Sequence, residues 1–260
     1  MLRFIHRRMV SCILLLPILF VVAMAQDVDQ SANRGTDFKG TDLKGTDLRG
    51  KVQLTRNGRL VHDASKVVVW LTPLGTTPAP LLLQQRSQIP QLVQKDKMFH
   101  PSLLVIPAGG QVEFPNQDPF FHNVFSLFDG KRFDLGLYES GTTQFVKFDK
   151  PGISFIFCNI HAQMSAVVIA LNTPYYAISN GHGEISIGNV VPGRYRMHVF
   201  HSSVSPEALH AVEREITVTP GDTFLGSFGL AESNLELAHK NKYGRDYDPP
   251  QPDSPAYARP

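Results

Sequence analysis

Three side chains that can bind a soft metal ion occur close together near the middle of the chain. Cys158, His161 and Met164 form the pattern Cys-x2-His-x2-Met, and His122, followed by Asn123, lies 36 residues before the cysteine. One thiolate and two imidazoles in a plane, with a weak axial thioether, are the ligands of a type 1 copper site. A short loop can return three of these side chains to one metal while a neighbouring strand supplies the fourth. The pattern therefore predicts one type 1 copper ion.

Each of these side chains also has an ordinary structural use. A single cysteine is usually a small buried side chain, a methionine after an aromatic strand usually fills a core, and a loop histidine is usually solvated. Zinc is the main chemical alternative because it binds Cys and His readily, but it prefers a fourth ligand harder than a thioether. The occurrence of all four side chains together favours copper.

The N-terminal segment indicates an exported protein. Three arginines precede an apolar run at residues 12–23, which ends in the small-x-small pattern of residues 23–25. We expect residues 1–25 to be a secretory signal peptide and the mature protein to be periplasmic or secreted, with membrane attachment only if this segment stays uncleaved. Cleavage removes Cys12, so no intramolecular disulfide can form. Metal binding then explains an unpaired Cys158 in an oxidising compartment.

Charge and motifs limit the function classes. The 25 basic residues, less three signal arginines, leave 22 against 23 acidic residues in the mature chain. This balance does not predict a nucleic-acid-binding surface. The sequence has no Gly-x-Ser-x-Gly elbow, phosphate-binding glycine loop or His-Glu-x-x-His helix. We therefore expect a protein that is not an enzyme.

The chain divides by composition. Residues 26–49 form a polar linker that contains three tandem units of Gly-Thr-Asp-(Phe/Leu)-(Lys/Arg). Short β-rich segments with turn residues between them follow, and none has the apolar spacing of a long amphipathic helix. We expect a copper domain at residues 50–172, a smaller β-sandwich-like module at 173–232 and a disordered Pro-rich tail at 233–260. The early strands near residues 50–71 could belong to either module.

His62, His182, His210 and His239 lie in polar or turn-like surroundings and are expected at the surface.

Three separated blocks carry a closer resemblance. They are Val112-Glu-Phe-Pro-Asn-Gln-Asp-Pro-Phe-Phe-His-Asn-Val-Phe-Ser126, Arg132-Phe-Asp-Leu-Gly-Leu-Tyr138 and Pro151-Gly-Ile-Ser-Phe-Ile-Phe-Cys-Asn-Ile-His-Ala-Gln-Met-Ser165. The chain resembles the cupredoxin (blue copper) superfamily, and in particular secreted bacterial plastocyanin-like proteins labelled methylamine-utilisation proteins. The resemblance implies an all-β, Greek-key cupredoxin sandwich with His122, Cys158, His161 and Met164 as ligands.

The resemblance also implies roles for neighbouring residues. Asn123 would tie the two ligand-bearing segments together by hydrogen bonds, although a turn-forming Asn is the alternative. Phe121, Ile160 and Ala162 would form an apolar patch that docks redox protein partners, although they could equally belong to the core. Residues 183–195 resemble the carboxypeptidase-regulatory-like, transthyretin-like sandwich modules, which bring no chemistry of their own.

The expected function is single-electron transfer between redox partners through a Cys-His-His-Met copper site. Two alternatives remain open. One is a copper-binding trafficking or assembly factor, and the other is a secreted binding module whose sandwich no longer holds metal.

Overall fold

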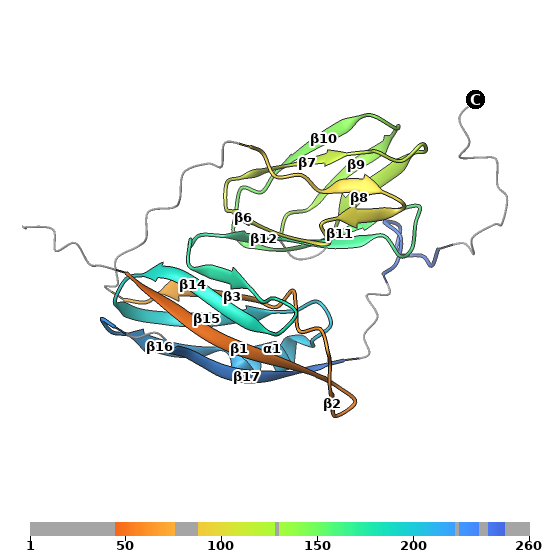
Figure 1. Ribbon diagram of the computed structural model, residues 1–260. Coiled ribbons are helices and arrows are strands. Elements are labelled where there is room, and N and C mark those ends of the chain that lie inside the picture. The colour runs from red at the N-terminus through yellow and green to blue at the C-terminus, as the bar shows by residue number, and fades with distance from the viewer. Residues whose placement is uncertain (1–44, 76–87, 128–129, 222–223, 234–238, 248–260) are drawn as a thin grey trace, which may run out of the picture. The chain divides into compact units, whose positions relative to one another are not determined.

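The computed structural model describes residues 45–75, 88–127, 130–221, 224–233 and 239–247 (Figure 1). The predicted signal peptide and nearly all of the predicted linker lie outside these residues. The described residues form seventeen strands and one short helix, so the predicted all-β sandwich class is confirmed. None of the helices in this part of the chain has the length and apolar character needed to span a membrane.

Five strands form the sheet that carries the predicted ligands. In the order across the sheet they are β6 (Leu103–Pro107), β12 (Ser165–Leu171), β11 (Gly152–Cys158), β8 (His122–Ser126) and β9 (Phe133–Tyr138). Neighbouring strands are antiparallel except β6 and β12, which are parallel. Two further pairs add residues to the same core: β7 (Gln111–Pro115) with β10 (Thr143–Lys147), and β4 (Val93–Lys95) with β5 (Met98–His100). We call these nine strands the metal-site sandwich.

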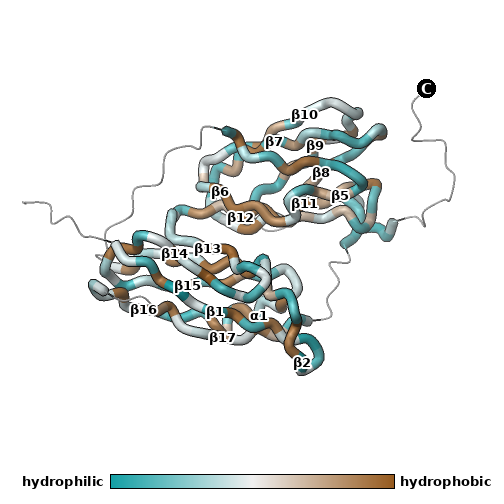
Figure 2. Tube along the Cα trace, in the orientation of Figure 1, coloured by the Kyte–Doolittle hydropathy of each residue, from teal (hydrophilic) through white to brown (hydrophobic). Residues whose placement is uncertain are grey.

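Strand β12 is apolar along its whole length because both of its faces are covered. Successive side chains of a strand point to opposite faces, and here the two sets enter two different apolar clusters. One set is Ala166, Val168 and Ala170, and the other is Val167, Ile169 and Leu171. The hydrophobic colour along β12 in Figure 2 follows from this double burial.

The core of the metal-site sandwich surrounds two of the predicted ligands. Cys158 and Met164 are fully buried in one apolar cluster with Phe114, Val124 and Ile156. Each such large apolar side chain contributes about 1.5–3 kcal/mol to stability when it is fully buried. Close packing of this kind leaves the side chains few alternative positions, so the core holds the cysteine and the methionine in fixed places.

The remaining strands form two sheets around a separate apolar cluster. One sheet has the order β14-β1-β17, with β2 paired to β1, and the other has the order β13-β3-β15-β16. The bounds are β1 Thr46–Arg56, β2 Arg59–Leu60, β3 Val68–Pro73, β13 Tyr176–Ile178, β14 Glu184–Val190, β15 Gly193–Phe200, β16 Arg214–Val218 and β17 Phe224–Glu232. Helix α1 (Pro206–Val212) begins after the N-cap residue Ser205 and lies between β15 and β16 in the sequence.

This pairing corrects the expected domain boundary. The expected copper domain began at residue 50, although the strands near residues 50–71 could have belonged to either module. Strands β1 and β3 pair with β14, β17, β13 and β15. An apolar run such as residues 67–70 indicates a buried strand but does not identify the strand it pairs with. The second sandwich is therefore built from strands within residues 46–73 and 176–232, and the nine strands of the metal-site sandwich lie between these two stretches in the sequence.

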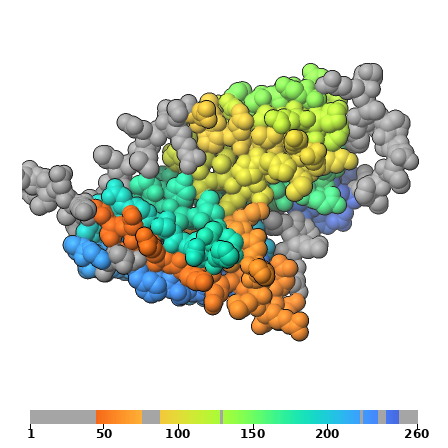
Figure 3. All heavy atoms as spheres, in the orientation of Figure 1, coloured from red at the N-terminus to blue at the C-terminus, as the bar shows by residue number. Residues whose placement is uncertain are grey.

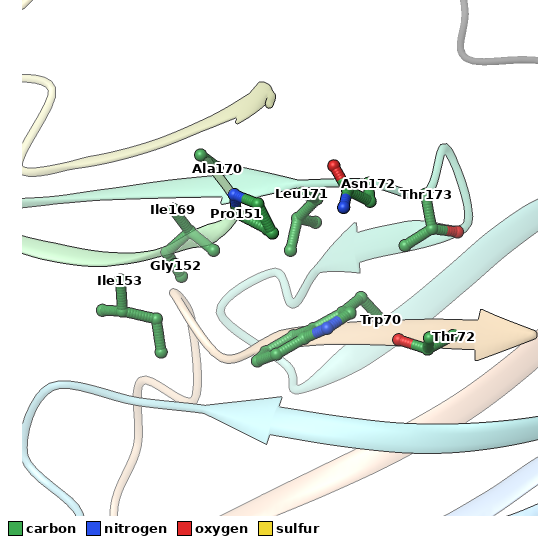
Figure 4. Close-up of a pocket in the computed structure, with 10 residues that line it drawn as sticks. All are labelled: Trp70, Thr72, Pro151, Gly152, Ile153, Ile169, Ala170, Leu171, Asn172 and Thr173. Atoms are coloured by element: carbon green, nitrogen blue, oxygen red, sulfur yellow. The ribbon is translucent and has the colours of Figure 1, made fainter. Parts of the chain in front are cut away.

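A pocket of about 320 Å³ lies near Trp70 and the start of β11 (Figure 4). Trp70 stacks on His198 with ring centroids 5.0 Å apart, and Ile153 and Leu171 contribute apolar walls. The lining contains no charged side chain and none of the predicted ligands. This pocket is therefore separate from the candidate metal site.

Residues 239–247 depart from the expected disordered tail. Several of their backbone and side-chain groups form hydrogen bonds with the metal-site sandwich. The prediction of disorder rested on the polar, Pro-rich composition after residue 231, and composition does not reveal such specific hydrogen bonds. The Pro-rich residues 248–260 lie outside the described part of the chain.

Candidate metal centre

The predicted ligands come from the ends of three strands. His122 begins β8, Cys158 ends β11, and Met164 immediately precedes β12. Strands β8 and β11 are paired, with Cys158 opposite Val124. This antiparallel pairing brings the start of β8 to the end of β11, which places the histidine beside the cysteine even though they are far apart in sequence.

The loop between β11 and β12 is closed by its own backbone. The Cys158 N–H donates to the Met164 carbonyl at 3.1 Å, and the Met164 N–H donates to the His161 carbonyl at 3.1 Å. Both strands that flank the loop are anchored in the core. The loop therefore returns Cys158, His161 and Met164 to one end of the sandwich, as the spacing predicts.

The structure brings three of the four predicted ligands into one cluster. The Cys158 Sγ lies 3.5 Å from His122 Nδ1 and 3.6 Å from His161 Nδ1, and the three candidate donor atoms all lie within 4.8 Å of one another. Metal–sulfur and metal–nitrogen bonds of about 2.3 and 2.0 Å place ligand atoms roughly 3.5–3.8 Å apart. The cluster therefore has room for a single ion bound by all three atoms.

Met164 lies in the same buried core as Cys158, and its side chain is fully buried. Its backbone closes the ligand loop. The Met164 sulfur stays a predicted fourth ligand. Among the residues the structure describes, His122, Cys158 and His161 form the one group of histidine, cysteine and carboxylate side chains that is close enough to hold an ion.

Burial keeps both imidazoles neutral near pH 7. Burial and the nearby His122 and Lys97 charges lower the pKa of His161 to about 4. Burial also lowers the pKa of His122, although the hydrogen bond to Asp118 acts in the opposite direction. A neutral imidazole has a lone pair available for a metal. The histidines are therefore ready to act as ligands without losing a proton.

In the metal-free protein, burial favours the protonated thiol of Cys158. Burial raises the pKa of Cys158, while the backbone N–H groups of Asn123, Ile160 and His161 partly oppose this effect. A buried thiolate is costly without a cation, and a coordinating metal deprotonates the thiol outright. The same backbone N–H groups would stabilise the thiolate in a metal-bound state.

Asp118 is a neighbour of the site that the sequence analysis did not identify. Its Oδ2 lies 2.8 Å from His122 Nε2, and both side chains are almost fully buried. The carboxylate also accepts the backbone N–H groups of Asp96 at 2.6 Å and of Lys97 at 3.0 Å. These hydrogen bonds and that from His122 keep the pKa of Asp118 low despite its burial, which alone would raise it.

This contact decides which nitrogen of His122 faces the cysteine. An ionised carboxylate only accepts hydrogen bonds, so Nε2 carries the proton and Nδ1 carries the lone pair. Nδ1 is the atom that lies near Cys158 Sγ. A carboxylate bound to the far nitrogen of a ligand histidine both orients the ring and makes it a stronger donor to a metal. In sequence, Asp118 followed by Pro119 looks like an ordinary turn, and only its position four residues before His122 could have drawn attention to it.

Asn123 links the two ligand-bearing segments through its backbone. The Asn159 N–H donates to the Asn123 carbonyl at 2.8 Å. The Asn123 side chain points elsewhere, because its Nδ2 donates to Asp134 Oδ1 at 2.7 Å. The predicted tie is thus present in the main chain, while the side chain connects the site to β9.

The predicted docking residues differ in exposure. Phe121 is 41 % exposed and Ala162 is also exposed, whereas Ile160 is half-buried against the core of the metal-site sandwich. Phe120 contacts both imidazoles, with ring centroids 5.4 Å from His122 and 5.6 Å from His161. His161 is the least buried of the four predicted ligands. This edge of the site is therefore the one nearest to solvent.

No family model matches the chain, and no curated protein sequence matches it. Among solved structures, the chain shows a partial likeness to a purple cupredoxin from Nitrosopumilus maritimus, at 22 % identity over 32 % of this chain and 99 % of that chain, with a TM-score of 0.29. An oxidized mutant of amicyanin is 14 % identical over 32 % of this chain and 81 % of its own, with a TM-score of 0.30. A copper-containing nitrite reductase from Thermus scotoductus is 21 % identical over 45 % of this chain and 28 % of its own, with a TM-score of 0.31. Likenesses this low assign neither a family nor a function, so the site must be judged by its own geometry.

Proposed function

We propose that this protein carries single electrons by means of one type 1 copper ion. His122, Cys158 and His161 would hold the ion, and Met164 would be a weak fourth ligand. One observation carries the proposal: the Nδ1 atoms of two neutral imidazoles lie 3.5 and 3.6 Å from one buried cysteine sulfur. When bound, copper supplies a one-electron redox couple.

The chemistry of the ligands supports copper over zinc. A thiolate with imidazoles and a thioether is a soft donor set that suits copper. Structural zinc sites are usually completed by a fourth cysteine, histidine or carboxylate. The fourth candidate here, Met164, is a buried thioether within the apolar core, and zinc has little affinity for such a ligand.

The rigidity of the site supports electron transfer over catalysis. Asp118 fixes the ring of His122, the loop backbone fixes Cys158 relative to Met164, and the core surrounds both sulfur atoms. Ligands held this firmly change little between two oxidation states, which favours rapid electron transfer. Since His122, Cys158 and Met164 are fully buried, the four predicted ligands would leave little space for a substrate beside the metal.

The partners and the location follow from the same proposal. Electrons would enter and leave at the His161 edge, where Phe121 and Ala162 are exposed and could contact redox protein partners. The protein would act in the periplasm or outside the cell after removal of residues 1–25. The second sandwich would be a structural module of the carboxypeptidase-regulatory-like type.

A titration of the metal-free protein with Cu(II), followed by visible absorption, tests the proposal. One equivalent of copper should give an intense colour, because charge transfer from the thiolate to Cu(II) requires the Cys158 sulfur. Ascorbate should bleach the colour and air or ferricyanide should restore it. His161→Ala should weaken binding, whereas His182→Ala, at an exposed histidine far from the cluster in sequence, should leave it unchanged.

Cys158→Ser provides the sharpest control because it removes only the sulfur. The serine variant should fold, as judged by its melting curve, and remain colourless with copper. A wild-type protein that stays colourless, or that binds copper as tightly after the serine substitution, would contradict the type 1 assignment. Tight binding of zinc with no reversible colour would instead indicate a zinc site.

A further inference from the structure

A segment near the C-terminal end of the chain contacts the strand and loop that carry the predicted ligands. Residues 239–247, which we call the C-terminal strap, follow β17 of the second sandwich in sequence but form hydrogen bonds to the end of β11 and the loop after it. Figures 1 and 3 show this blue segment against the green residues of the metal-site sandwich. The contact places residues about 80 to 90 positions downstream of Cys158 beside the site.

Tyr247 binds the cysteine itself. Its hydroxyl donates to the backbone carbonyl of Cys158 at 2.7 Å and lies 3.0 Å from His239 Nδ1. Burial raises the pKa of Tyr247, so the hydroxyl keeps its proton and remains a donor. A hydrogen bond to this carbonyl fixes the peptide plane that follows the sulfur-bearing residue. The position of the sulfur relative to the two histidines depends on that plane.

Lys242 connects the strap to the two segments that hold the ligands. Its backbone N–H donates to Asn159 Oδ1 at 2.9 Å, and its Nζ forms an ion pair with Asp134 at 2.8 Å. Asp134 in turn accepts a hydrogen bond from the side chain of Asn123. Asn159 follows the cysteine and Asn123 follows the first histidine, so one strap residue is linked to the neighbours of both ligands.

His239 completes the strap by packing against the ligand strand. Its ring stacks on Phe157 with centroids 4.0 Å apart, and it also lies against the backbone of Ala162 in the ligand loop. Its Nε2 atom is buried, which differs from the surface position expected for this histidine. The strap thus contacts residues on both sides of Cys158 and the loop between His161 and Met164.

We propose that the C-terminal strap positions the thiolate ligand and that Tyr247 is its principal positioning residue. This inference rests on the proposed copper function. The positive end of the Tyr247 hydroxyl dipole points at the cysteine carbonyl, which favours the reduced, less positively charged state of the site. The strap therefore stabilises the ligand geometry and raises the reduction potential.

The test compares Tyr247→Phe with Tyr243→Phe in the full-length chain. Tyr243 is 70 % exposed in the same segment, so its variant controls for the loss of a hydroxyl in general. The phenylalanine at 247 keeps the ring and removes only the hydrogen bond. We expect it to lower the reduction potential, shift the thiolate-to-copper absorption band and speed copper release to a chelator about fivefold, the effect of one buried hydrogen bond. Tyr243→Phe should change none of these.

Deletion of residues 239–260 is the stronger perturbation. Copper release should be faster than in Tyr247→Phe, while the melting transition of the second sandwich should stay in place. If the Tyr247→Phe variant and the truncation both match the full chain in potential, absorption and release rate, the strap has no positioning role and the inference is overturned.

Hydrogen exchange on the metal-free protein separates this inference from the proposed function. The Cys158 amide donates to the Met164 carbonyl, so its exchange rate reports how often the ligand loop opens. Truncation should increase that rate about fivefold or more if the strap holds the loop. If the full chain forms no coloured copper complex, the copper proposal fails, but faster exchange in the truncated protein would still support the strap. Unchanged exchange would refute it.

Discussion

Replacement of Asp118 by asparagine should raise the reduction potential of the copper-loaded protein. The substitution removes one negative charge and keeps a side chain of nearly the same size. Asp118 is suited to this test because its carboxylate is almost fully buried and contacts the far nitrogen of a predicted ligand. A negative charge there favours Cu(II) over Cu(I), so its loss should favour the reduced form.

The contact distance sets the size of the expected change. The carboxylate oxygen lies 2.8 Å from His122 Nε2, and the width of an imidazole ring plus one metal–nitrogen bond places a metal about 7 Å from it. Two unit charges at about 7 Å with an effective dielectric constant of about 20 interact by about 2.4 kcal/mol. For a one-electron couple, in which 59 mV corresponds to about 1.4 kcal/mol, this energy corresponds to ~100 mV.

Cyclic voltammetry or a redox titration of the visible band measures this potential. Asp149→Asn is the matched control, because it removes a carboxylate that is 52 % exposed and pairs with Lys131 on the same sandwich. Solvent screens that charge, so its removal should have little effect on the potential. The Asp118→Asn melting curve shows whether the turn at Asp96 and Lys97 tolerates the loss of an acceptor. A potential that falls, or that rises no more than in Asp149→Asn, would refute the role assigned to Asp118.

Three other substitutions or conditions give independent checks. Met164→Gln should keep copper bound and lower the reduction potential, because an oxygen ligand favours Cu(II). Met98→Gln, at a methionine that is 54 % exposed, should leave the reduction potential unchanged. An unchanged potential in Met164→Gln would remove Met164 from the site. The metal-free protein should lose stability as the pH falls from 6.5 towards 4. Burial holds the pKa values of His122 and His161 below the ordinary value of 6.5, so the unfolded chain binds more protons than the folded chain in that range. A flat stability profile in urea titrations over this range would contradict the burial of these rings. Val168→Ala should lower the free energy of unfolding by about 2 kcal/mol, because loss of this fully buried side chain would leave a cavity. A loss below about 0.5 kcal/mol in urea denaturation would show that the core can collapse around the substituted position.

The types of the His122, Cys158 and His161 side chains, together with the short spacing of the last two, were sufficient to predict the cluster. Two of these residues sit on one short loop, and the chemistry of their side chains is specific enough to suggest a common ion. The pattern of short β-rich segments bounded by turn residues was likewise sufficient to predict an all-β protein. Apart from His122, which lies 36 residues before Cys158, both inferences depend on residues that are near one another in sequence.

The features that the sequence did not reveal depend on contacts between distant residues. Asp118 looks like a turn residue until the fold places it against the buried ring of His122. Tyr247 lies in a polar, Pro-rich stretch whose composition predicts disorder, yet its hydroxyl reaches the Cys158 carbonyl. The partners of β1 and β3 could not be chosen for the same reason: each strand has an apolar face that several other strands could cover.

The order of strands along the chain has a consequence for folding during synthesis. A polypeptide synthesised from its N-terminus delivers β1 and β3 early, but the sheets of these strands are complete only when β13 to β17 are present. The nine strands of the metal-site sandwich are all present once residue 171 has emerged, so that half can fold while the other half is still arriving. The strap at residues 239–247 comes last of the described segments. Folding in this order leaves an interval in which the loop that follows Cys158 has formed but Tyr247 does not yet donate a hydrogen bond to the Cys158 carbonyl.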